Sequence, residues 1–195
     1  FPGVSVKLLS KNAAKVMVSF KEAKERLKYK ENVIYTGTPA KFNVENYDLL
    51  EKNKCKEAFG LQNIDKKLIL VTCGSQGAKR VNEVIMDMIK NIHSEKYYII
   101  LVTGDKNYDE IVEKLKEIKK EIGIDTKKYI KVEKFLFNMD QAYKAVDMCI
   151  TRAGAMTITE LSIAAKPSIL IPLPTAANNH QYYNAKVLED IGAAK

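Results

Sequence analysis

From residue 66 onward, short apolar runs alternate with segments in which apolar residues recur at helical spacing. A run that is apolar throughout, and not only at every second position, is typical of a strand buried on both faces in a parallel sheet. Alternation of such strands with amphipathic helices predicts an α/β protein with a doubly wound, mostly parallel sheet. The five runs are KLILVTC, YYIILVTG, YIKVEKF, DMCIT and SILIPLP.

The first 65 residues show a weaker form of the same pattern. Strands are predicted in AKVMVSF and NVIYTG, around a helix in KEAKERLKYK. Residues 41–60 are typical of a connector followed by one more helix. At 195 residues the chain could form one large domain or two small ones, and no repeat or low-complexity tract divides it.

The composition is that of an ordinary globular protein, with 46% hydrophobic and 29% charged residues. The three cysteines are scattered without zinc-type spacing, which predicts reduced thiols in a cytosolic protein. No apolar run approaches the ~20 residues of a membrane span, and no signal peptide is recognisable. Phe1 in place of an initiator Met, and a last segment without a cap or tail, lead us to expect a fragment of a longer protein.

The formal net charge of +8 comes mainly from the first 70 residues. In KEAKERLKYKE the charges alternate in sign, as on a solvated helix, and do not cluster with aromatic residues as in a nucleic-acid site. The pattern argues against nucleic acid as a partner and leaves open a basic face toward anionic lipid.

Ligands of doubly wound sheets bind beyond the carboxyl ends of the strands. Two small-residue turns in this position open helices, whose free N–H groups and positive dipole ends favour phosphate. Together they could bind a diphosphate, although a tight strand-to-helix turn would also explain the glycines. The first turn is Gly74-Ser75-Gln76-Gly77-Ala78, and the second is Gly154 followed by Ala155, Met156 and Thr157.

Further polar residues follow the same strands. Glu160 lies one turn after Thr157 and is expected opposite the core side of its helix, where it could accept two ribose hydroxyls or simply be a solvated carboxylate. After the last strand, two asparagines precede His180 and Gln181, whose side chains suit a hydroxyl-rich ligand. His180 could be a catalytic base or a helix-start donor, and His93 is expected on the surface.

Missing motifs narrow the function. The chain has no GxxxxGK[ST] and no GxGxxG, which argues against a P-loop kinase and a simple dinucleotide dehydrogenase. It has no Asp-x-Asp to hold a metal on a diphosphate. Helix dipoles and neutral donors would then have to carry the charge of a bound diphosphate.

Taken together, these residues resemble the MurG family, bacterial enzymes that transfer N-acetylglucosamine (GlcNAc) from UDP-GlcNAc to lipid I and so make lipid II of peptidoglycan. TGTPAKF is similar to the family's T-G-N-P-V-R turn, and CGSQGAKRVNEVI is similar to its G-G-S-Q-G-A-x-x-x-N loop. RAGAMTITE matches R-[AS]-G-A-x-T-x-x-E, and QYYNA matches Q-x-x-N-A. Three positions depart from the family: Thr38 replaces Asn, Lys41 replaces Arg and Cys73 replaces Gly.

The resemblance implies that residues 1–195 are the C-terminal UDP-sugar-binding domain, one Rossmann-like half of a GT-B glycosyltransferase, without the N-terminal acceptor domain and the final helices. It implies substrate-binding roles for ten residues and no catalytic residue, because the proposed base belongs to the absent domain. Leu136 would contact uracil, Glu160 the ribose, His180 and Gln181 the GlcNAc, and Lys41 the base or phosphate. The diphosphate would be bound by Ser75, Ala155, Met156 and Thr157, and Gln76 would be a further substrate-binding residue.

The implied whole protein is an inverting hexosyltransferase that needs no metal cofactor and acts in cell-wall biogenesis, cell shape and cell division. It would transfer GlcNAc to the C4 hydroxyl of the muramoyl sugar of lipid I, at the inner face of the cytoplasmic membrane as a peripheral protein. The 195-residue chain alone is expected to bind donor without turnover. Two alternatives remain open: the donor subunit or domain of another UDP-sugar GT-B transferase, and a nonenzymatic nucleotide-binding module.

Overall fold

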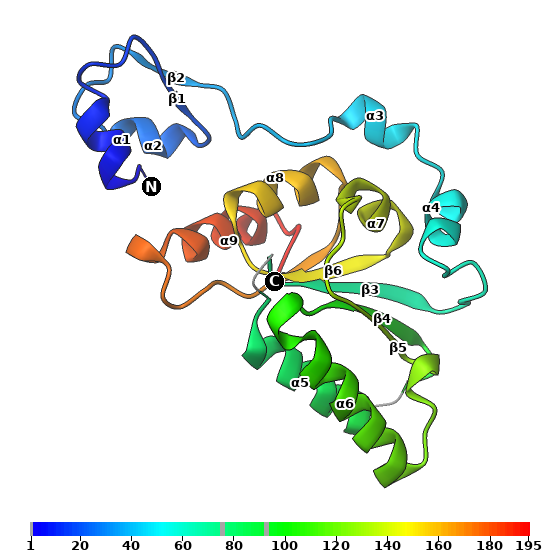
Figure 1. Cartoon of the computed structure of the whole chain (residues 1–195). Coiled ribbons are helices and arrows are strands. Elements are labelled where there is room, and N and C mark those ends of the chain that lie inside the picture. The colour runs from blue at the N-terminus through cyan, green and yellow to red at the C-terminus, as the bar shows by residue number, and fades with distance from the viewer. Residues whose placement is uncertain (1, 75–76, 92–93) are drawn as a thin grey trace.

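The main body of the molecule is a five-stranded, all-parallel sheet with the strand order β5-β4-β3-β6-β7 (Figure 1). The computed structural model describes residues 2–74, 77–91 and 94–195. The strand order reverses direction at β3, as expected of a doubly wound sheet, so the predicted fold class is confirmed. The strands are β3 (Lys67–Thr72), β4 (Tyr97–Val102), β5 (Ile130–Glu133), β6 (Met148–Thr151) and β7 (Ser168–Leu170).

Helices cover both faces of this sheet (Figure 1). The long helices α5 (Lys79–Asn91) and α6 (Asp105–Ile122) pack on one face around a core that includes Val71 and Leu101. The other face carries a second core around Leu70, beneath three helices: α7 (Met139–Ala145), α8 (Ala155–Ile163) and α9 (His180–Asp190). Burial on both faces explains why the strand sequences are apolar without alternation.

Shorter elements complete the main body. One-turn 3-10 helices, η1 (Thr126–Lys128) and η2 (Ala177–Asn179), precede β5 and α9. At the other end of the chain, Ala194 bridges to Ser168, and the Leu170 amide donates to the Lys195 carbonyl at 2.7 Å. The last residues therefore extend the sheet beside β7.

Residues 41–60 form two helices, α3 (Val44–Asp48) and α4 (Lys52–Ala58), so the prediction of one helix there was wrong. The Asn43 side chain accepts from the Asn46 amide at 2.9 Å and caps α3. Glu51 has extended backbone angles, φ −93° and ψ 124°, and this break separates the two helices.

The first 36 residues contain a separate small unit: α1 (Val4–Leu9), β1 (Val16–Val18), α2 (Lys21–Glu25) and β2 (Val33–Tyr35). The two predicted strands are present, but they pair with each other in a parallel two-stranded sheet and do not join the main one. The predicted helix is shorter than its sequence pattern. The core of this unit consists of Val16, Val18, Leu27 and Val33.

Candidate functional site

The turn between β3 and α5 brings backbone against backbone at the carboxyl edge of the sheet. Gly74 and Gly77 have φ of 80° and 67°, and the Gly77 amide donates to the Gly74 carbonyl at 2.9 Å. A Cβ on Gly77 would lie 1.9 Å from the Thr103 carbonyl oxygen, so only glycine fits there. The candidate residues Ser75 and Gln76 lie outside the described residues.

The Thr103 carbonyl, just after β4, binds two side chains, a contact that was not predicted from the sequence. It accepts hydrogen bonds from the side-chain amides of Asn107 at 3.0 Å and Asn82 at 3.4 Å. Asn82 is 2% exposed and lies among apolar residues of α5. In the sequence, the only indication of this contact is that Asn82 lies among apolar residues in VNEVI, where a polar side chain needs a buried partner. These contacts hold the starts of α5 and α6 together at one edge.

The second small-residue turn places an open helix N-terminus at the same edge. Gly154 has extended angles, φ −67° and ψ 149°, and no side chain caps α8. The first intrahelical bond runs from the Ile158 amide to the Gly154 carbonyl at 2.9 Å. The amides of Ala155, Met156 and Thr157 precede it, and such amides have no partner within a helix. Arg152 donates to the Ile171 and Pro172 carbonyls, both at 3.2 Å, and fixes the turn beside the loop after β7.

Glu160 is buried, with 9% of its surface exposed, so its expected position opposite the core side of α8 was wrong. The physical reason is a polar partner inside the core: the Tyr143 hydroxyl donates to Glu160 Oε2 at 3.1 Å. Burial raises the pKa of Glu160, while this hydrogen bond and the positive charge of Lys41 act to lower it. The structure therefore brings Lys41 and Glu160 together across about 120 residues of sequence.

The loop after β7 presents His180 and Gln181 at the start of α9. The His180 Nδ1 atom lies 2.9 Å from the Ala177 carbonyl oxygen, so it donates and leaves Nε2 for another partner. Gln181 Oε1 accepts from the Leu173 amide at 2.9 Å, which leaves its NH2 group as a donor. Asn178 and Asn179 have φ of 53° and 52°, the left-handed conformation that makes this turn tight.

Asn184 links α9 to the turn before α8. Its side-chain amide donates to the Ala153 carbonyl at 3.0 Å, and the residue is 8% exposed. This contact was not singled out from the sequence, although Asn184 belongs to the QYYNA motif. It fixes His180 relative to the N-terminus of α8.

A hollow of about 450 Å³ lies in front of this turn, between the main body and the small unit. Ala155, Asn178, His180 and Asn184 line one side, and residues 17–20 at the end of β1 line the other. Among the candidates, Ala155 and His180 therefore share one cavity. Its volume is within the usual range for small-molecule sites.

Leu136 does not line that hollow. Its side chain is 8% exposed and packs in the core beneath α7. Neither its N–H nor its C=O pairs with another backbone group of the described residues. The expected contact of Leu136 with uracil stays a prediction.

Cys73, at the end of β3, is not an activated nucleophile. Burial raises the pKa of its thiol to about 11, against the opposing influence of Arg152. Within the described ranges, no group of three His, Cys, Asp or Glu residues could hold a metal ion. That the site binds its ligand without a metal ion stays a prediction.

The sheet order, the uncapped α8 and the buried acid on that helix define a doubly wound α/β domain with polar groups at the carboxyl edge of its sheet. The chain belongs to a known family of such domains, the glycosyltransferase family 28 C-terminal domain, whose model matches residues 68–195. This confirms the family relationship indicated by the motifs.

Curated relatives extend the match over the whole chain. A protein of Ruminiclostridium cellulolyticum is 38% identical over 195 residues, and one of Alkaliphilus metalliredigens is 40% identical over 196. Both are named UDP-N-acetylglucosamine--N-acetylmuramyl-(pentapeptide) pyrophosphoryl-undecaprenol N-acetylglucosamine transferase. All of this chain is covered, but it spans only 51% and 50% of these relatives.

Two solved structures have folds similar to that of this chain. The crystal structure of Acinetobacter baumannii MurG matches with a TM-score of 0.68 and 27% identity, over 99% of this chain and 49% of that one. Anabaena Alr3699/HepE in complex with UDP matches with a TM-score of 0.56 and 13% identity, over 97% of this chain and 58% of that one. The second likeness shows the fold alone.

Proposed function

We propose that this chain is the donor-binding half of an inverting N-acetylglucosaminyltransferase that uses UDP-GlcNAc and acts on lipid I to form lipid II. The observation that carries the proposal is a buried carboxylate, Glu160, on the same helix as an uncapped N-terminus at the carboxyl edge of the sheet. The names of the relatives, all transferases of GlcNAc, support the choice of sugar.

The diphosphate would lie at the N-terminus of α8. The amides of Ala155, Met156 and Thr157 have no hydrogen-bond acceptor within the helix, because no helical turn precedes them. The helix dipole adds positive potential at this end. Because Arg152 and Asn184 fix the turn through carbonyl contacts, these donors need little rearrangement to bind an anion. Ser75 and Gln76 are proposed to contact the diphosphate from the other turn.

Glu160 would accept hydrogen bonds from the ribose hydroxyls. Tyr143 occupies Oε2 and orients the carboxylate, which leaves Oε1 for the sugar. Lys41, close enough to act on the Glu160 pKa, would lie near the base or the phosphates as a point charge. The backbone N–H and C=O groups of Leu136 would pair with uracil.

His180 Nε2 and the Gln181 NH2 group would face the GlcNAc hydroxyls.

In the reaction, the C4 hydroxyl of the acceptor sugar attacks the anomeric carbon from the face opposite UDP, the bond to the diphosphate breaks, and the configuration inverts. Negative charge develops on the departing diphosphate, and prearranged amides at α8 stabilise it most when the charge is largest. The base that takes the acceptor proton is proposed to lie outside this chain, so the chain alone binds donor without turnover.

Acceptor and membrane contacts are proposed for the remainder of the protein. In the described part of the chain, no helix is both long and apolar enough to cross a bilayer. We place the whole protein at the inner face of the cytoplasmic membrane as a peripheral enzyme, with lipid I as acceptor and no nucleic-acid partner.

Calorimetric titration of the chain with UDP-GlcNAc tests the proposal, with UDP-glucose and ADP-glucose as controls, before and after addition of magnesium. We expect UDP-GlcNAc to bind more tightly than both controls, with the same affinity in the presence and absence of magnesium. A folded chain that binds none of the three, or prefers ADP-glucose, would contradict the proposal. Preference for UDP-glucose would favour another UDP-sugar transferase.

A further inference from the structure

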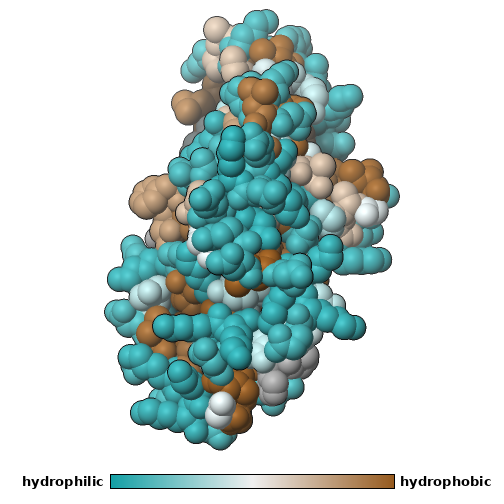
Figure 2. Space-filling model, turned by 90° about the vertical axis from the view of Figure 1, so that its right-hand side faces the viewer, coloured by the Kyte–Doolittle hydropathy of each residue, from teal (hydrophilic) through white to brown (hydrophobic). Residues whose placement is uncertain are grey.

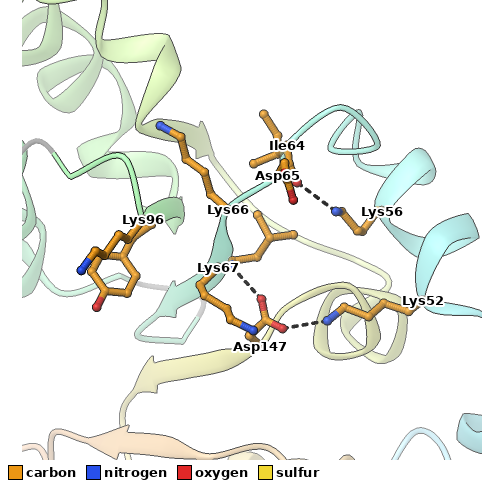
Figure 3. A pocket seen from close by; sticks show the side chains of 10 residues that line it. Lys52, Lys56, Ile64, Asp65, Lys66, Lys67, Lys96 and Asp147 are labelled. Atoms are coloured by element: carbon orange, nitrogen blue, oxygen red, sulfur yellow. Dashed lines mark hydrogen bonds and ion pairs between the residues drawn. The ribbon is translucent and has the colours of Figure 1, made fainter.

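A second hollow, of about 530 Å³, lies at the amino ends of β3 and β4, at the opposite edge of the sheet from the candidate donor site (Figures 1 and 3). Figure 2 views the molecule from the side of this edge and shows a mainly hydrophilic surface. Five lysines line the hollow against two aspartates, Asp65 and Asp147. The lysines are Lys52, Lys56, Lys66, Lys67 and Lys96.

Carboxylates neutralise this cluster only in part: Lys66 is paired with Glu95 at 2.9 Å. Asp147 accepts from the Lys52 ammonium at 2.7 Å and from the Leu68 amide at 2.8 Å, so one carboxylate is already shared (Figure 3). Lys67 is near enough to help lower the pKa of Asp147, but it forms no ion pair with another described residue. Lys96 is exposed and likewise has no ion-pair partner within the described part of the chain.

A further cation, Lys166, lies near Lys52 and Asp147 of the hollow. Lys166 is half-buried and donates to the Val146 carbonyl at 2.8 Å. Burial lowers the pKa of Lys166, and the nearby charges of Lys52 and Lys144 lower it further, while Asp147 and Cys149 act to raise it. The five lining lysines and Lys166 thus outnumber the three nearby carboxylates, Asp65, Asp147 and Glu95, and an anionic partner would relieve the repulsion among the lysines.

The shape and residue types favour an extended anion over a compact one. The lining contains no arginine, whose planar fork binds phosphate bidentately, and lysines on flexible stems suit several separated carboxylates. Tyr97, which is 47% exposed, and the half-buried Ile64 also line the hollow, so it offers apolar contact as well. An acidic polypeptide segment with an apolar side chain matches both features.

A lipid surface fits less well, and this step rests on the proposed function. A strand of six residues is about 20 Å long. A membrane bound at the amino edge would therefore hold the donor site at the far end of the sheet, away from a lipid-borne acceptor. We propose that this lysine hollow is a docking site for an acidic segment of a partner protein.

The test uses fluorescence anisotropy with a labelled decapeptide of Glu and Asp residues around a central Leu. At low salt we expect saturable binding to the chain that weakens as salt screens the charges. The double variant Lys67→Glu/Lys96→Glu should lose affinity by about tenfold or more, since four units of charge change at the hollow. The matched control is Lys11→Glu/Lys120→Glu, which makes the same charge change at exposed positions elsewhere and should bind the peptide nearly as wild type does.

Failure to bind the peptide, or equal loss in both double variants, would overturn the proposal. So would co-sedimentation with vesicles of phosphatidylglycerol and phosphatidylcholine that needs Lys67 and Lys96 while the peptide does not bind, because the surface would then be a lipid contact. UDP-GlcNAc titration of the same variants separates the two proposals. Donor affinity should be unchanged in Lys67→Glu/Lys96→Glu, whether or not the peptide binds.

Discussion

At the scale of single residues, Glu160 is the clearest conflict between stability and a binding role. A carboxylate at 9% exposure with one hydroxyl donor is under-solvated, and its pKa is raised for that reason. Such a group destabilises the fold at neutral pH unless a ligand uses it. Tyr143 and Lys41 both act to lower this pKa and so favour the ionised carboxylate, the form that the proposed ribose contact requires.

Glu160→Gln should therefore stabilise the fold and weaken donor binding. A raised pKa means that ionising Glu160 costs stability in the folded state. The full cost applies at pH above the raised pKa, and it vanishes well below 4.5, the ordinary pKa of a glutamate. We expect the variant to melt about 2 °C higher at pH 7, with the gap closing as the pH falls through the raised pKa toward 4.5. UDP-GlcNAc affinity should fall about tenfold, because a charged acceptor is lost.

Differential scanning calorimetry across pH and donor titration measure these two effects. Glu57→Gln, which changes an exposed carboxylate in α4, is the control and should alter neither. A Glu160→Gln protein that melts lower at pH 7 with unchanged affinity would show that the carboxylate is structural.

Tyr143→Phe removes the hydroxyl that stabilises the Glu160 carboxylate. We expect a loss of about 1 kcal/mol in the free energy of unfolding and a further rise in the pKa of Glu160. Donor affinity should then begin to fall at a higher pH than in wild type as the pH is lowered. Tyr98→Phe, at a buried tyrosine with no side-chain hydrogen bond to a described residue, is the matched control. Coincident pH profiles of affinity for wild type and Tyr143→Phe would rule out this role.

At the scale of elements, the turns at the carboxyl edge depend on close backbone approach. Gly77 lies against the Thr103 carbonyl, which two asparagines also bind. The glycines and the helix starts were predictable from the sequence, because small residues after apolar runs have a local conformational meaning. Their contact with the end of the next strand was not, because it depends on how β3 and β4 are placed side by side.

Gly77→Ala should destabilise the protein more than Gly60→Ala, although the two glycines have nearly the same positive φ. Gly60 has φ of 66° and nothing within 4 Å of the place that a Cβ would take, so Gly60→Ala should cost about 1 kcal/mol from backbone strain alone. The Cβ of Gly77→Ala would lie 1.9 Å from a backbone oxygen, and the cost should reach about 3 kcal/mol or more. Urea unfolding of the two variants measures the difference, and equal costs would mean that the loop moves freely from Thr103.

At the scale of the whole molecule, stability is expected to be uneven. The small unit has a core of four buried residues and two strands of three residues each, while the main sheet has cores on both faces. A two-stranded sheet with so little covering is marginal. Met17 and Tyr35, on its strands, are 70% and 56% exposed.

Hydrogen exchange should therefore separate the two parts. We expect the amides of β1 and β2 to exchange much faster than those of β3 and β4, because local opening of the small unit breaks few contacts. Mass spectrometry after timed exchange, with peptides from both sheets, gives the comparison. Equal protection would mean that the small unit is held by contacts beyond its own core.

The sequence predicted the parallel sheet, its five strands and the small-residue turns at its carboxyl edge, because buried strands and helix starts leave local signatures. It did not predict the separation of the small unit, since strand propensity does not say which sheet a strand joins. It also misplaced Glu160, because the hydroxyl that makes burial tolerable lies on α7, 17 residues earlier. Long-range polar partners of this kind have no periodic signal.

The central claim is that the N-terminus of α8 binds the diphosphate of a UDP-sugar. The most direct measurement is nuclear magnetic resonance of the ¹⁵N-labelled chain during titration with UDP. We predict that the amides of Ala155, Met156 and Thr157 shift together and saturably, while those of Lys67 and Lys96 at the opposite edge do not. Saturable shifts confined to the lysine hollow, with the α8 amides unmoved, would contradict the account.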